Sequence, residues 1–359
     1  MAKVDGGELF VRTLEAAGVE TIFTLHGGHL DAIFQATRGR EMRLVDMRHE
    51  QAAGHAADGW ARTTGKTGVA IVTAGPGFTD CVTAIANAWL DCVPTLFVAG
   101  AAPLREAETL PLQGGIDQVA MVAPITKWAH RVTHTERIPD LTAQALRIAR
   151  SGRPGPVFLE LPIDVLFARV DEERATAPGR FAPDAAAAPP REAAERAVAL
   201  LHAAERPAIL AGGGAWFAGA GAELVSFAER TGTPVFTNGK AHGLIPGDHQ
   251  LAGRGVVNLA AAAAAGLGQA DVVLVLGARL GLFTGGRGAR LIPAGAVVIQ
   301  VDVSPEEIGR NRDVELAIAA DVRGTLRAFD AAAAERSWPD RSGWQRAIAG
   351  VRDGHRIVF

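Results

Sequence analysis

The feature that most constrains the fold is a series of short apolar segments that recur along the chain and are separated by longer stretches with helical patterns. Most of these segments are apolar throughout rather than at alternate positions, which is typical of strands in parallel sheets covered on both faces. The sequence therefore predicts an α/β fold built from doubly wound parallel sheets. The expected strands lie at 21–25, 43–47, 68–74, 95–100, 156–162, 206–214, 233–238, 271–278 and 296–303.

A segment rich in Ala and Pro interrupts this series at residues 171–190, "DEERATAPGRFAPDAAAAPP". It has no strand pattern, and its position between two complete β/α series favours a linker over a long surface loop. The 359 residues are ample for two domains. We therefore expect a first domain over 1–170 and a second over 191–335.

The composition is that of an ordinary globular protein, with 21% charged residues and a formal net charge of -3. This charge predicts neither a nucleic-acid partner nor a membrane partner. No apolar run approaches the roughly 20 residues of a membrane span, and the N-terminus lacks a signal sequence. We expect a soluble, cytoplasmic protein. The two cysteines, Cys81 and Cys92, fit neither a disulfide framework nor a CxxC site, so core packing is expected for both.

In the first domain, an acidic residue follows the expected strand 43–47. Ligands bind beyond the carboxyl ends of parallel strands, so Glu50 stands where chemistry is expected. Taken alone, Glu50 could equally be a carboxylate that stabilises a helix N-terminus. The next strand, 68–74, ends in Gly75-Pro76-Gly77, a turn that lets the backbone approach a flat ligand closely.

In the second domain, the strand 206–214 ends in Gly212 to Gly214. This turn could open on a phosphate, but the full dinucleotide fingerprint with its downstream acid is incomplete. A nicotinamide-dependent dehydrogenase is therefore disfavoured.

The segment 48–80, "RHEQAAGHAADGWARTTGKTGVAIVTAGPGFTD", resembles the signature of thiamine-diphosphate (ThDP) enzymes of the acetolactate synthase group. "SGRPGPVFLELPIDV" resembles the end of the same domain in that family, and the resemblance continues from about Glu8 to Gly324. It implies a ThDP pyrimidine-binding domain followed by a central domain like those that bind FAD or ADP. The implied activity is that of a lyase or ligase acting on a small carbonyl substrate, a 2-oxo acid or a 1,2-diketone.

The resemblance also implies roles for residues of the first domain. Glu50 would hydrogen-bond N1′ of the cofactor's aminopyrimidine, and Gln118, within "LPLQGGIDQVAMVAPITKWAH", would face the substrate, although a solvated loop position is an alternative. Asp80 stands where the family often has Asn, which leaves that cofactor contact open. The residues expected against the pyrimidine are Thr73, Gly75, Pro76 and Gly77.

For the central domain, the resemblance implies that FAD or ADP is held by residues that follow successive strands. An arginine would bind phosphate, and the acids would bind ribose or adenine. A purely structural domain without a nucleotide is the alternative. The implied residues are Arg279, Asp302, Ile308 and Asp321.

Catalytic chains of this family carry a third domain with a Gly-Asp-Gly motif that ligates Mg²⁺ and, through it, the cofactor's diphosphate. No such motif occurs in the expected place here, and residues 336–359 resemble the helix that leads toward that domain. We therefore expect this diphosphate-binding domain to be absent and this chain to contain no metal ligands. Such a chain should be inactive alone, and it would be a truncated piece or one subunit of a split enzyme. The family's site forms between subunits, which implies a homodimer or homotetramer, possibly with a separate diphosphate-domain subunit. A nucleotide-binding regulatory module is the alternative function.

The loop "HGGH", residues 26–29, follows the first expected strand. In the family this loop presses its glycines toward the cofactor, which implies that Gly27 and Gly28 lie near ThDP. A histidine on each side of it resembles cyclohexane-1,2-dione hydrolase, and neutral imidazoles can move protons near neutral pH. We therefore predict that His26 and His29 line the substrate side. The alternatives are a helix cap plus a packed side chain, or a metal pair, which is disfavoured because no third ligand has a suitable spacing.

Overall fold

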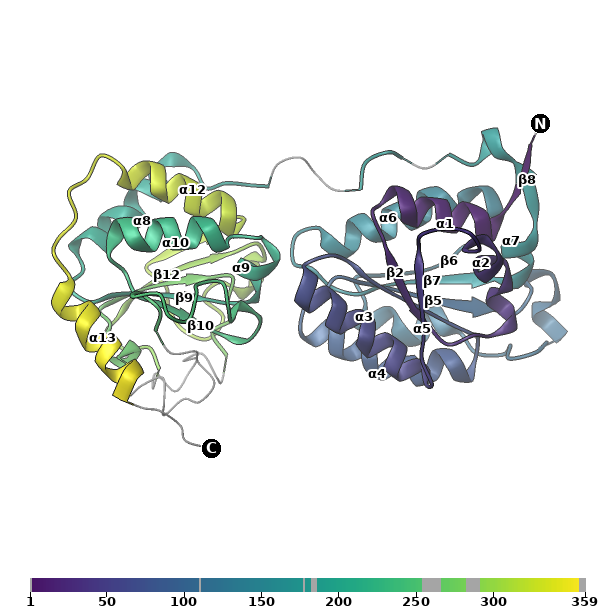
Figure 1. The fold of residues 1–359 in the computed structure, drawn as a ribbon, viewed down its shortest axis with the longest axis horizontal. Coiled ribbons are helices and arrows are strands. Elements are labelled where there is room, and N and C mark those ends of the chain that lie inside the picture. The colour runs from purple at the N-terminus through teal and green to yellow at the C-terminus, as the bar shows by residue number, and fades with distance from the viewer. Residues whose placement is uncertain are drawn as a thin grey trace. The chain divides into compact units, whose positions relative to one another are not determined.

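The computed structural model describes residues 2–109, 111–176, 178–181, 186–253, 266–281 and 291–354. The chain forms two compact units, Met1–Pro183 and Asp184–Phe359, and each has its own central sheet with helices around it (Figure 1). All strand pairs within the two large sheets are parallel. The predicted α/β class with two doubly wound domains is therefore confirmed.

The sheet of unit 1 has six strands in the order β3-β2-β4-β5-β7-β6. The continuous apolar runs form its buried centre, whereas β3 is an edge strand whose residues are mostly exposed. One strand, β6, was not among those expected from the sequence. The strands are β2 (Thr21–Thr24), β3 (Arg43–Asp46), β4 (Gly68–Val72), β5 (Thr95–Ala101), β6 (Trp128–Arg131) and β7 (Val157–Pro162).

Helices cover both faces of this sheet. The two longest helices of this unit, Glu50–Thr64 and Pro76–Leu90, pack closely because small residues line their contact. A side chain at Gly54 would place its Cβ 2.5 Å from the Cβ of Ala84. The helices are α1 (Gly6–Ala16), α2 (Asp31–Ala36), α3 (Glu50–Thr64), α4 (Pro76–Leu90), α5 (Gln118–Val122), α6 (Ile138–Arg150) and α7 (Ile163–Phe167), with 3₁₀ turns η1 (Gly28–Leu30), η2 (Leu104–Thr109), η3 (Ala123–Ile125), η4 (Thr135–Arg137) and η5 (Glu172–Arg174).

The two ends of unit 1 meet in a small antiparallel sheet, in which β1 (Lys3–Asp5) pairs with β8 (Arg169–Asp171). Phe181 also packs against the core of this unit. The first residues of the interval expected to be a linker, 171–190, thus belong structurally to unit 1.

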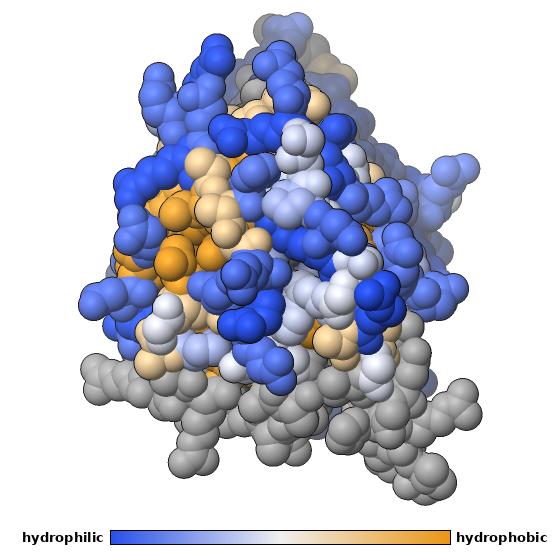
Figure 2. Space-filling view, turned by 90° about the vertical axis from the view of Figure 1, so that its left-hand side faces the viewer, coloured by the Kyte–Doolittle hydropathy of each residue, from blue (hydrophilic) through white to orange (hydrophobic). Residues whose placement is uncertain are grey.

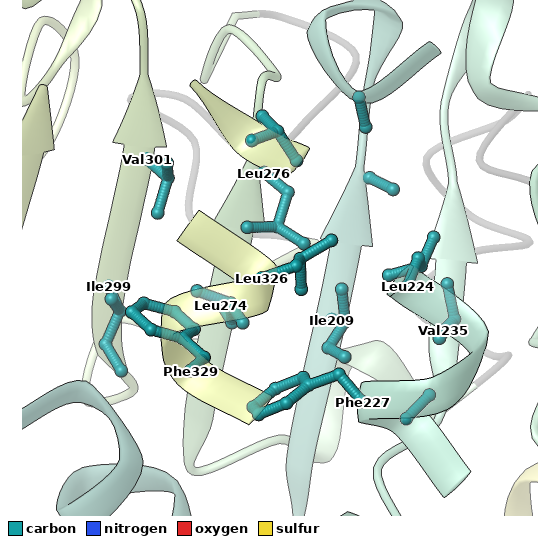
Figure 3. Close-up of a cluster of buried hydrophobic side chains, with 14 of the residues drawn as sticks. Ile209, Leu224, Phe227, Val235, Leu274, Leu276, Ile299, Val301, Leu326 and Phe329 are labelled. Atoms are coloured by element: carbon teal, nitrogen blue, oxygen red, sulfur yellow. The ribbon is translucent and has the colours of Figure 1, made fainter. Parts of the chain in front are cut away.

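Unit 2 has a five-stranded sheet in the order β10-β9-β11-β12-β13. Figure 3 shows how Phe227 and Leu224 from one helix and Leu326 and Phe329 from another cover the apolar side chains of this sheet. The strands are β9 (Pro207–Ala211), β10 (Val235–Thr237), β11 (Val272–Leu276), β12 (Val297–Asp302) and β13 (Leu316–Ala319). The helical segments are α8 (Arg191–Ala203), α9 (Gly213–Phe217), α10 (Gly221–Thr231), η6 (Gly239–Ala241), η7 (Leu267–Gln269), η8 (Pro305–Glu307), α12 (Val322–Ala333) and α13 (Ser342–Gly354).

The last helix, α13, is part of the core of unit 2. Trp344 and Ile348 are buried in it, and the indole Nε1 of Trp344 donates to the carbonyl of Pro207 at 2.9 Å. Just before the helix, the buried Arg341 donates to backbone carbonyls at the ends of α8 and α10. Residues 336–354, which the sequence analysis set apart from the second domain, are thus packed into it.

Within the described ranges, none of the helices is both long and apolar enough to cross a bilayer. Figure 2 faces unit 2 and shows a mainly hydrophilic surface with one hydrophobic area at its side. Among the residues that the structure describes, the large hydrophobic side chains that are clearly exposed belong to unit 1, and they include Leu112, Ile116 and Met121 near its candidate site.

Candidate functional site

The candidate site of unit 1 lies at the carboxyl ends of three neighbouring strands, β2, β4 and β5. The loop 25–30 follows β2, the turn 73–77 follows β4, and Gly100 lies near the end of β5. Because the strands are parallel and adjacent, segments far apart in the sequence converge at one edge of the sheet.

Glu50 is the first residue of α3, and the preceding His49 caps this helix by accepting a hydrogen bond at Nδ1 from the amide of Gln51, 3.1 Å away. The Glu50 carboxylate lies directly over Gly77. A Cβ added at Gly77 would stand 2.8 Å from Oε1 of Glu50 and 2.7 Å from Cγ2 of Thr73. Glycine at position 77 is therefore what allows Glu50 and Thr73 to come together.

The turn before α4 has a backbone that glycine adopts readily. Gly75 is buried with φ 61° and ψ -116°, and Pro76 occupies the first turn of the helix, where the missing N–H of proline costs nothing. The predicted close turn at Gly75-Pro76-Gly77 is thus present.

His29 and Thr73 form the polar contact at the centre of the site. His29 is 5% exposed, with Nδ1 3.2 Å from Oγ1 of Thr73 and Nε2 3.3 Å from the carbonyl of Leu112. A carbonyl only accepts, so Nε2 carries the proton and the Thr73 hydroxyl donates to Nδ1. Burial lowers the pKa of His29, which keeps the imidazole neutral.

Two glycines allow this close packing. A Cβ at Gly27 would stand 2.3 Å from Cβ of Thr73, and a Cβ at Gly100 would stand 2.5 Å from Cβ of His29. A Cβ at Gly28 would meet no atom within 4 Å. Gly27 and Gly100 are therefore packing positions, whereas Gly28 faces open space.

His26 does not join this cluster. Its side chain is 66% exposed, its Nε2 lies 2.8 Å from Oδ1 of Asp31, and its ring packs against Phe34 with centroids 5.1 Å apart. Of the two predicted histidines, the structure brings only His29 to Thr73.

Gln118 is near the site but faces away from solvent. It is 2% exposed, and its amide bonds the backbone of Gly75 and Gly100. The alternative, a solvated loop position, does not hold, because Gln118 begins helix α5 and its side chain is buried.

Asp80 lies in α4, with Oδ2 3.7 Å from Nε2 of His49. Side-chain ligand atoms of His49, Glu50 and Asp80 lie within 4.8 Å of one another, a grouping that the sequence analysis did not find because the residues come from two helices. Cys81, the next residue in α4, is 1% exposed and packs in the core as predicted, and burial raises the pKa of its thiol to about 12.

The residues predicted to hold a nucleotide follow β11, β12 and β13 in unit 2. Asp302 accepts from the amide of Ser304 at 2.9 Å, Asp321 caps α12 by accepting from the amide of Gly324 at 2.9 Å, and Ile308 is half-buried. Arg279 is exposed just beyond β11. The glycine turn 212–214 packs against Gly277 at the same edge of the sheet.

Comparisons with known proteins agree with both units. Residues 4–121 match the N-terminal TPP binding domain of thiamine pyrophosphate enzymes, and residues 194–329 match the central domain of the same enzymes. Thiamine pyrophosphate is another name for ThDP.

Similar curated proteins include a probable acetolactate synthase large subunit of Methanocaldococcus jannaschii, 35% identical over 350 residues, which are 96% of this chain and 58% of that protein. An acetolactate synthase large subunit of Mycobacterium tuberculosis is 36% identical over 344 residues, 96% of this chain and 60% of that protein. The chain thus spans about three fifths of the length of these relatives. Since both domain families match in order and the relatives align over nearly the whole chain, the chain belongs to the thiamine pyrophosphate enzymes and carries their N-terminal and central domains.

Proposed function

We propose that this chain supplies the pyrimidine-binding half of a ThDP-dependent lyase or ligase that acts on 2-oxo acids or 1,2-diketones. The observation that carries the proposal is the Glu50 carboxylate held over Gly77 at the carboxyl edge of a parallel sheet. The family membership makes ThDP the ligand to test against this geometry.

The residues present fit the aminopyrimidine of ThDP. Glu50 would share a proton with N1′ in a hydrogen bond, Gly77 leaves room beside the Glu50 carboxyl group, and Gly28 leaves the opposite loop open. When bound, ThDP supplies the carbon nucleophile that attacks a carbonyl group. The chain's own contribution is to place the Glu50 carboxyl group for proton transfer and to keep the backbone at Gly77 close to it.

His29 supports the proposed carbonyl substrate. Its neutral imidazole sits beside the glycine turn and takes part in a defined hydrogen-bond pair with Thr73. A neutral imidazole can donate or accept a proton near neutral pH, which suits C–C cleavage or hydration of a diketone. His26 would reach the substrate only after leaving Asp31, so we assign the larger role to His29.

The relatives are longer than this chain, and we propose that a further domain provides the Mg²⁺ and diphosphate half of the site. That domain would come from the same polypeptide or from a partner, within a homodimer or homotetramer. Native mass measurement of the cellular protein, with and without ThDP and Mg²⁺, tests this arrangement. A monomer of this chain alone that binds ThDP fully would contradict it.

A nucleotide in unit 2 is the second part of the proposal. Its support is the edge where Gly212 and Gly214 pack on Gly277, with the Lys240 side chain beside Gly213. Asp302 ends β12, and Arg279 and Asp321 follow β11 and β13, whose carboxyl ends lie at this edge. Titration with FAD and with ADP, followed by flavin fluorescence or calorimetry, tests it. Absence of binding by both would leave unit 2 a structural domain.

The deciding experiment on the first site uses the full-length protein with ThDP and Mg²⁺, and pyruvate and cyclohexane-1,2-dione as probe substrates. Glu50→Gln should lower turnover at least about a hundredfold, since general acid–base groups contribute factors of roughly 10²–10⁴. Glu41→Gln is the matched control, because Glu41 is exposed and lies in the same unit. Equal turnover of Glu50→Gln and the wild type would overturn the proposal.

A further inference from the structure

Gln118 occupies a position that the family resemblance does not explain. It begins the short helix α5, directly after Asp117, which caps that helix by accepting from the amide of Ala120. Although the resemblance gives Gln118 a place facing the substrate, its side chain is only 2% exposed. A buried amide must satisfy its donor and acceptor inside the protein.

Both ends of the Gln118 amide are bonded to backbone groups. Oε1 accepts from the amide N–H of Gly75 at 2.9 Å, and Nε2 donates to the carbonyl of Gly100 at 3.0 Å. The orientation of the amide is fixed by these partners, because an N–H can only donate and a carbonyl can only accept. Reversing it would place two donors together at Gly75 and two acceptors together at Gly100.

The two backbone groups belong to the parts of the site that are proposed to hold ThDP. Gly75 opens the turn that leads to Gly77 and Glu50, and Gly100 is the residue against which His29 packs. One side chain therefore joins the end of β4 to the end of β5. It sets where the turn 75–77 lies relative to His29.

A buried acid, Glu160, lines the same cavity as Gln118. Glu160, in β7, is 2% exposed, accepts from Nε of Arg131 at 3.1 Å at one oxygen, and has no hydrogen-bond partner at the other. Burial raises the pKa of Glu160, and the hydrogen bond from Arg131 opposes that rise. Gln118, Arg131 and Glu160 line one cavity of about 80 Å³ beside the turn.

We infer that Gln118 is a positioning residue, which ties the turn 75–77 to Gly100 and His29, and that it does not contact the substrate. The expected effect of Gln118 on ThDP binding rests on the proposed function. That Gln118 holds the turn 75–77 in place rests on the two backbone hydrogen bonds alone. Its side chain is only 2% exposed, so little of the Gln118 amide is open to a substrate.

The test uses Gln118→Met in the full-length protein, because methionine has a similar length and removes both hydrogen bonds. Thr135→Val is the matched control: Thr135 is also buried in unit 1, and its hydroxyl donates to the carbonyl of Val165 at 2.7 Å. The control loses a buried bond from side chain to backbone without touching the turn.

Hydrogen exchange of the Gly75 amide is the first readout. It should rise about fivefold in Gln118→Met and stay unchanged in Thr135→Val, since a net hydrogen bond is worth about 1 kcal/mol and 1.4 kcal/mol is tenfold. Unchanged exchange at Gly75 would overturn the inference whatever the protein binds.

The second readout separates positioning from substrate contact. With pyruvate or cyclohexane-1,2-dione as the probe, Gln118→Met should raise the Kd for ThDP about tenfold or more and change KM at saturating ThDP less than about twofold. A raised KM with an unchanged Kd for ThDP would show a substrate contact and overturn the inference. If the wild type binds no ThDP, the proposed function falls, and the exchange measurement still decides whether Gln118 holds the turn.

Discussion

Replacing Gly77 with alanine should separate the stability of unit 1 from the function of its site. The added Cβ would stand 2.7 Å from Cγ2 of Thr73 and 2.8 Å from Oε1 of Glu50, so something must move. Thr73 is β-branched and is held by His29, whereas the Glu50 carboxylate is the free end of a flexible side chain. The clash is therefore relieved chiefly by displacement of Glu50.

The magnitudes follow from this asymmetry. Overpacking costs about 1–3 kcal/mol, and alanine regains up to about 1 kcal/mol over glycine in a helix, so the net loss of folding stability is about 0–3 kcal/mol. A displacement of about 1 Å at a catalytic group costs on the order of a hundredfold in rate. Function should thus fall far more than stability.

Urea unfolding and ThDP-dependent turnover of the full-length protein measure the two effects. Gly59→Ala is the control, because Gly59 lies within α3 and its added Cβ would meet no atom within 4 Å. It should stabilise the protein by roughly 0.5–1 kcal/mol and leave turnover unchanged. Turnover of Gly77→Ala within threefold of the wild type would refute the position of Glu50 over this glycine.

Three further predictions concern buried basic side chains. Arg341→Met should lower the free energy of unfolding by about 3–5 kcal/mol, because the guanidinium, 4% exposed, donates to the carbonyls of Leu201 and Thr231; a loss below about 1 kcal/mol in urea unfolding would contradict this. Burial lowers the pKa of His29 in the folded chain. As the pH falls below about 6.5, the unfolded chain therefore takes up a proton at this residue before the folded chain does, and the free energy of unfolding decreases. His29→Gln should lack this decline in unfolding curves measured from pH 7 to 5. Burial lowers the pKa of Lys127 to about 8 from its ordinary 10.5, so stability should rise with pH across that interval in the wild type and not in Lys127→Met.

The sequence predicted those parts of the fold that depend on local pattern. All the expected apolar segments became strands, and Glu50, Thr73 and Gly77 converged because parallel strands align their carboxyl ends. Strands such as β13 were missed, since its residues alternate between buried and exposed over only four positions. The packing of α13 into unit 2 was missed because it depends on Trp344 meeting a core formed by residues far earlier in the chain.

The site itself shows why residue type is a weaker guide than three-dimensional neighbours. His26 and His29 are equivalent in the sequence motif, yet only His29 is turned inward, because Gly100 leaves room for it and Thr73 and the carbonyl of Leu112 bond both its ring nitrogens. None of these partners is within 40 residues of His29 in the chain. A pattern in the sequence could identify the loop but not the direction of each side chain.

The adjacent glycines of that loop differ in the same way. A side chain at Gly27 would strike Thr73, whereas a side chain at Gly28 would enter open space. Gly27 is thus required for the chain to pack on itself, and Gly28 is the position at which the loop leaves room for a ligand. Because Thr73 contacts Gly27, Gly77 and His29 at once, the turn after β4 and the loop after β2 cannot move independently. A ligand that displaces the loop at Gly28 should therefore also shift Thr73, and through Gly77 the position of the Glu50 carboxylate.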